Sequence, residues 1–115
     1  MAGYKKQSSV CISLVNDTCI KKLNKMYRGK NKPTDVLSFN SPKEILALND
    51  FLGDVVISVQ TAERNAKEDG ITTKEEIARL TIHGLLHLLG YDHEGKKAEA
   101  QKMMKLQNKI VAEIL

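Results

Sequence analysis

Aromatic residues, cysteines and long apolar runs are all scarce in this 115-residue sequence. With no Trp and only 4% aromatic residues, it is a poor match to single-strand binders that stack bases on a surface of aromatic rings. Cys11 and Cys19 could form a disulfide, but a chain of this length folds without one. No apolar run reaches membrane-spanning length and residues 1–10 show no signal peptide, so we expect a cytoplasmic protein without a membrane partner.

Length and hydrophobic periodicity predict a single domain, 1–115, of the α+β class. We expect a small mixed sheet of about three strands packed with four helices, and an irregular segment over 40–52. The expected strands are 8–15, 34–39 and a third that opens at 53–54, and the expected helices are 18–28, 61–69, 74–89 and 96–114. Thr73, with Glu76 three residues on, predicts the capping box that begins the third helix.

Positive charge is concentrated near the start of the chain. Residues 1–43 hold nine Lys or Arg against two Asp, whereas the rest of the chain is net acidic. Six of these cations form a candidate RNA-binding segment: Lys21, Lys22, Lys25, Arg28, Lys30 and Lys32. The alternative is a solvated helix face followed by a polar loop, and charge alone does not separate the two.

All three histidines of the chain fall within eleven residues. His83 and His87 are four residues apart on an expected helix, so both imidazoles project from one face. Gly90 ends that helix and lets the chain turn so that His93 can reach the same ion. Three imidazoles leave a fourth position open, which is typical of catalytic zinc, although nickel or another divalent metal would also suit them. The alternative is three unrelated histidines.

The histidine spacing is that of the metzincin proteases, a three-His site at the end of a helix, with one difference. Gly84 stands where those enzymes carry their general-base glutamate, and this argues against a peptidase. Another carboxylate could act as the general acid or base, and the candidates are Asp92, Asp35 and Asp54. The same residues could instead orient a metal ligand. Asp92 could equally be a turn residue.

The segment His83-Gly84-Leu85-Leu86-His87-Leu88-Leu89-Gly90-Tyr91-Asp92-His93 resembles the signature of the YbeY family of rRNA-maturation endoribonucleases. The resemblance extends over about residues 8–110. It includes Leu23-Asn24, Tyr27-Arg28, the segment from Pro33 to Phe39, and Gly53-Asp54. Family members usually have a further helix and strand before the strand that begins here near Ser8.

The resemblance implies a single-strand-specific, zinc-dependent endoribonuclease that acts in 16S rRNA 3′-end maturation and ribosome quality control. Its partners would be single-stranded RNA and the small ribosomal subunit. The resemblance implies catalytic roles for His83 and Arg28, with Arg28 facing phosphate, although Arg28 could also simply interact with the helix dipole. A metal-stabilised RNA-binding assembly factor with little cleavage activity is the main alternative, and a metallopeptidase is a lesser one.

Overall fold

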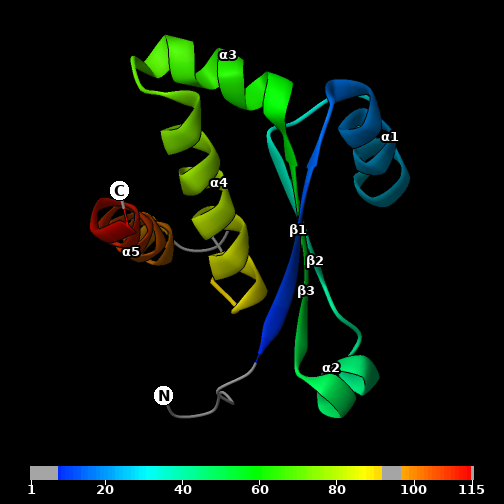
Figure 1. Cartoon of the computed structure of the whole chain (residues 1–115). Coiled ribbons are helices and arrows are strands. Elements are labelled where there is room, and N and C mark those ends of the chain that lie inside the picture. The colour runs from blue at the N-terminus through cyan, green and yellow to red at the C-terminus, as the bar shows by residue number, and fades with distance from the viewer. Residues whose placement is uncertain (1–7, 92–96, 115) are drawn as a thin grey trace.

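A computed structural model describes residues 8–91 and 97–114, and in them a three-stranded mixed sheet is packed with helices (Figure 1). The strands are β1 (Ser9–Val15), β2 (Val36–Asn40) and β3 (Phe51–Ser58), in the order β1-β3-β2. β1 runs parallel to β3 and β2 runs antiparallel to it, which confirms the predicted mixed sheet. β3 is therefore the central strand, and β2 is an edge strand of the described sheet.

Helices cover both faces of this sheet. α1 (Asp17–Arg28) lies on one face, and α4 (Thr73–Leu88) packs on the other against β2 and β3. α3 (Val59–Asp69) and α5 (Lys97–Ile114) both pack against α4. Because α4 does not extend over β1, Ile12 and Leu14 on that face remain 44% and 56% exposed.

The described residues contain five helices, so the expected number of four is wrong. The additional one is α2 (Lys43–Asn49), inside the segment that we expected to be irregular. Its seven residues are too few to show a helical period, and Pro42 precedes it as a turn residue does. Asp50 ends it in the left-handed conformation, with its N–H bonded to the carbonyl of Leu46.

Alternation along the strands produces a separate core on each face of the sheet. Val55 and Ile57 point toward α4 and pack with Leu80 and Leu88. Val56, with Leu37 on β2, points toward α1 and packs with Ile20. The face on which a β2 or β3 side chain lies therefore decides whether it can meet the histidines on α4.

Capping residues define where the helices begin. Asn16 caps α1, with its side-chain oxygen accepting from the N–H of Cys19 at 2.8 Å. Thr72 caps α4 by accepting from the N–H of Glu75, so the prediction that Thr73 caps this helix in a box with Glu76 is wrong by one residue. Cys11 and Cys19 are exposed and free, and no disulfide joins them. None of the helices described is both long enough and apolar enough to cross a membrane.

Candidate active site

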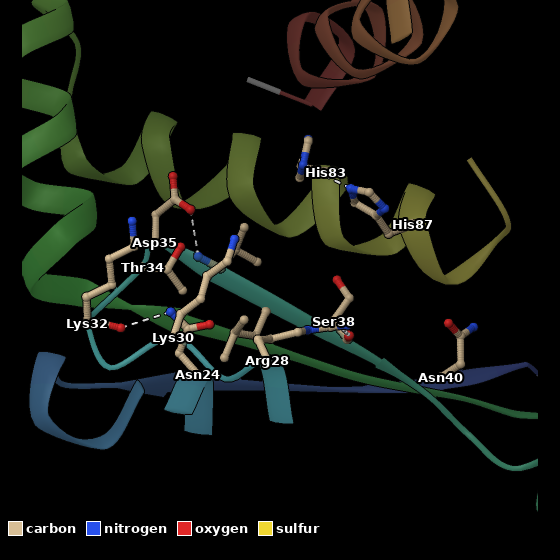
Figure 2. Close-up of a pocket in the computed structure, with 12 residues that line it drawn as sticks. Asn24, Arg28, Lys30, Lys32, Thr34, Asp35, Ser38, Asn40, His83 and His87 are labelled. Carbon is tan, nitrogen blue, oxygen red and sulfur yellow. Dashed lines mark hydrogen bonds between the residues drawn. The ribbon is translucent and has the colours of Figure 1, made fainter. Parts of the chain in front are cut away.

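A cleft of about 680 Å³ separates α4 from the C-terminal end of α1 and the segment that follows it (Figure 2). Figure 2 shows the two histidines on the α4 side, and Arg28 with Asn24 across from them. The residues that line the cleft are mostly polar: Asn24, Arg28, Lys30, Lys32, Thr34, Asp35, Val36, Leu37, Ser38, Asn40, His83 and His87. Its size suits a ligand, and its lining suits a charged one.

His83 and His87 face each other from consecutive turns of α4. Their Nε2 atoms are 3.2 Å apart and their ring centroids 4.8 Å apart, as the four-residue spacing predicts. His93 and Asp92 lie outside the described residues, so their positions stay predictions. In the ranges 8–91 and 97–114, no group of three or more His, Cys, Asp or Glu is arranged to hold a metal ion. The structure thus brings together two of the three predicted ligands.

The orientation of His83 is set by Gln107 from α5. Gln107 is only 5% exposed, and its Oε1 lies 2.7 Å from Nδ1 of His83. Because an amide oxygen only accepts, this contact places the ring proton of His83 on Nδ1 and leaves the Nε2 lone pair facing His87.

Gln107 was not among the residues predicted for the site. The α5 segment shows an apolar stripe that includes Met103, Leu106 and Ile110, and Gln107 lies beside it. Met103 is buried, but Gln107 is buried as well. A polar residue that interrupts the apolar face of a helix was the signal that could have revealed it.

Gly84 lets α4 approach the sheet closely. A Cβ at this position would lie 2.6 Å from Cγ1 of Val55 and 3.1 Å from Oγ of Ser38. That hydroxyl in turn donates to the Gly84 carbonyl at 3.2 Å. The position that holds a glutamate in metzincins is therefore filled here by the sheet, which explains physically why no carboxylate stands there.

Arg28 reaches the cleft from the last turn of α1. Its Nη2 donates to the Ser38 carbonyl on β2 at 2.8 Å, and its Cζ lies 5.5 Å from the centre of the Phe39 ring. Among the described residues this is its only side-chain hydrogen bond, although a guanidinium has five N–H donors. Arg28 can therefore hold its place and still bind an anion.

The predicted RNA-binding residues divide into two sets. Lys30 and Lys32 line the cleft with Arg28, and Asn24 holds the loop in place by donating to the Lys32 carbonyl at 2.9 Å. The other three lysines are exposed on α1 and do not line it: Lys21, Lys22 and Lys25. This role of Asn24 was not predicted from the sequence, where Asn24 stands out only as part of a motif.

The two described aspartates of the predicted set differ in position. Asp35 lines the cleft, but both its carboxylate oxygens accept hydrogen bonds, from the N–H of Val36 at 2.8 Å and from Asn65 at 3.3 Å. Asn65 also donates to Glu76, whose pKa is raised by burial. Asp54 is paired with Phe39 across the sheet and lies on the α1 face, away from the histidines.

Comparisons with known proteins identify the family. A family model described as Endoribonuclease YbeY matches residues 1–115. Over 109 residues the chain is 50% identical to the Endoribonuclease YbeY of Persephonella marina, covering 91% of this chain and 69% of that protein. Over 103 residues it is 48% identical to that of Aquifex aeolicus, covering 90% and 68%.

A solved structure is similar in fold as well as in sequence. The solution structure of a protein from Thermotoga maritima matches with a TM-score of 0.68 and 37% identity, over 94% of this chain and 69% of that one. The chain thus spans roughly two thirds of the length of the relatives it matches. The family model and the curated relatives give the same assignment: this chain belongs to the YbeY family of endoribonucleases.

Proposed function

We propose that this chain is a zinc-dependent, single-strand-specific endoribonuclease of rRNA processing, acting on 16S rRNA at the small ribosomal subunit in the cytoplasm. One observation carries the proposal. Two facing imidazoles stand across a cleft from Arg28 and two lysines, in a member of an endoribonuclease family. This arrangement puts ligands for a metal ion opposite groups that bind phosphate.

The described histidines fit a divalent metal ion. Gln107 directs the Nε2 lone pair of His83 toward His87, and neutral imidazole nitrogens are preferred zinc ligands. His83, His87 and the predicted ligand His93 would hold the ion, and nickel would suit the same donors. When bound, the ion supplies Lewis acidity and a nucleophile at neutral pH.

The remaining groups of the cleft bind and orient the RNA backbone. Arg28, held by the Ser38 carbonyl, stabilises the negative charge that develops on the phosphodiester during cleavage. Lys30 and Lys32 contact neighbouring phosphates, which gives strong salt dependence and weak sequence preference. A groove that binds backbone in this way suits an unpaired strand.

One observation favours a second candidate, a metal-stabilised RNA-binding assembly factor that cleaves slowly. Within the described part of the cleft, Asp35 is the only carboxylate, and both its oxygens already accept hydrogen bonds. A peptidase is disfavoured, because the sheet occupies the space that a glutamate at position 84 would need.

Cleavage of a single-stranded RNA by protein of known metal content tests the proposal. We expect cleavage to stop on chelation, to return with zinc, and to be lost by at least about 100-fold in His87→Ala. Met104→Ala, on the exposed side of α5, is the control variant and should cleave normally. RNA binding without cleavage by folded, zinc-loaded protein would favour the assembly factor, and cleavage that persists in chelator would refute the metal-dependent reaction.

A further inference from the structure

Tyr27 is a large aromatic residue that the fold leaves mostly uncovered. It lies in the last turn of α1, directly before Arg28, and is 60% exposed. Burial in the core therefore does not account for a tyrosine at this position. Exposure alone assigns no function to a single ring. The position directly before Arg28 is what places this ring within reach of a strand bound there.

The Tyr27 ring is nonetheless held in place. It packs edge-on against Phe39 of β2, with ring centroids 5.1 Å apart and ring planes at 61°. Phe39 itself packs against the buried cluster of Ile20, Leu37 and Val56. A ring anchored in this way loses little conformational freedom when a second ring stacks on it.

Arg28 connects this aromatic pair to the cleft. Its guanidinium lies 5.5 Å from the centre of the Phe39 ring, and the same side chain lines the cleft opposite the histidines. Lys25 is exposed one turn before Gly29 and adds positive charge nearby. Tyr27 is not among the residues that line the cleft, so a base can reach it where the strand leaves the cleft beyond Arg28.

We propose that the exposed ring of Tyr27 is a stacking site for one unpaired nucleobase of the bound RNA. The inference rests on the proposed function, because it requires an RNA strand in the cleft. Every base has a flat apolar face, so the site accepts any base and distinguishes unpaired from paired strands. The scarcity of aromatic residues therefore does not exclude stacking, since two of the five in the chain meet beside Arg28.

Equilibrium binding of a short single-stranded RNA, with chelator present to prevent cleavage, tests this site. We expect Tyr27→Ala to weaken binding by about 5- to 150-fold, the loss that corresponds to one stacked base. Tyr27→Phe should bind like the wild type. Met26→Ala is the matched control, because Met26 is the preceding residue and is 70% exposed, and it should leave affinity unchanged.

A second RNA of the same length without bases separates stacking from charge. Wild type and Tyr27→Ala should bind this RNA equally, and the salt dependence of binding should be the same for both, since phosphate contacts are intact. Equal weakening on both RNAs, or none on either, would overturn the stacking site. Loss of ribosomal-subunit binding with RNA affinity unchanged would instead assign Tyr27 to a protein contact.

Failure of the proposed function gives a different result. In that case the wild type would bind neither RNA in a salt-dependent way, and both proposals would fall together. Salt-dependent RNA binding that is the same in wild type and Tyr27→Ala would overturn the stacking site alone.

Discussion

The two sides of the cleft are built in different ways. We call His83 and His87, with Gly84 between them and Gln107 behind, the histidine wall. The basic wall consists of Asn24, Arg28, Lys30 and Lys32. Gly84 and Gln107 are buried in tight packing, whereas all members of the basic wall except Asn24 are exposed.

This difference matches what each wall has to do. Metal ligands need fixed positions, because small errors in geometry weaken coordination, and buried neighbours fix them. Phosphates along a flexible strand need charge more than position, and exposed cations on a helix end and a loop supply it. We therefore expect substitutions behind the histidine wall to change stability or metal affinity, and substitutions in the basic wall to change RNA binding.

Gly84→Ala gives the largest effect that we expect on folding. Alanine favours a helix over glycine by about 1 kcal/mol, but the added Cβ would lie 2.6 Å from Val55. Overpacking of this kind outweighs the helix preference, and we expect a net loss of about 1 to 3 kcal/mol in the free energy of unfolding, measured with urea. In a Val55→Ala background, which lacks the contacting methyl groups, Gly84→Ala should cost less than it does in wild type. A Gly84→Ala protein more stable than wild type would show that the wall is loosely packed.

Gln107→Met tests whether the hydrogen bond between Gln107 and His83 sets metal affinity. Methionine has a similar shape but lacks the oxygen that fixes the Nδ1 proton of His83, so zinc affinity should fall about 10- to 100-fold. Gln107→Glu keeps an acceptor oxygen and should retain affinity. Zinc competition titrations give the affinities, and nitrogen NMR of the histidine rings reports the tautomer. Equal zinc affinity in Gln107→Met, or an Nε2-protonated His83 in wild type, would contradict this role.

The smallest effect concerns how the helix of the basic wall is anchored. Asp17 at the start of α1 accepts from Ser58 at 2.6 Å and Thr61 at 2.7 Å, and it pairs with Arg64. The Ser58 and Thr61 hydroxyls and then Arg64 lower the pKa of Asp17 to about 2. The folded state therefore binds fewer protons than the unfolded state between about pH 4 and pH 2, and this stabilisation is lost as pH falls through that range.

Urea unfolding of metal-free wild type and Asp17→Asn across this pH range measures the effect. We expect wild type to be the more stable protein at pH 7, and the difference to shrink toward pH 2. Glu76 acts in the opposite direction. Because burial raises its pKa, its contribution to the free energy of unfolding falls as pH rises. A difference between the two proteins that is constant with pH would show that the charge of Asp17 does not anchor α1.

Local patterns were enough to predict that His83 and His87 face each other. His83 and His87 share one helix, and a four-residue spacing fixes their relation whatever the rest of the fold does. The strands and long helices were predicted for the same reason, since their apolar periods are clear. α2 was missed because seven residues cannot show a period.

Contacts between distant segments were harder to predict. Gln107 meets His83 across 24 residues of sequence, so even the local pattern of α5, which places Gln107 beside its apolar stripe, does not show which residue it contacts. Asp54 was predicted as a candidate acid of the site, but whether it faces α4 or α1 depends on strand register. The pairing of Tyr27 with Phe39 likewise depends on the last turn of α1 meeting a residue of β2, which composition could not reveal.

The central claim is that the histidine wall holds the metal and the basic wall does not. Zinc binding and RNA cleavage measured together in wild type, His87→Ala and Arg28→Ala test it most directly. We predict one zinc ion per wild-type chain, weak or no binding in His87→Ala, and unchanged affinity in Arg28→Ala, with cleavage reduced at least about 100-fold in both variants. Full zinc affinity in His87→Ala, or zinc loss in Arg28→Ala, would contradict it.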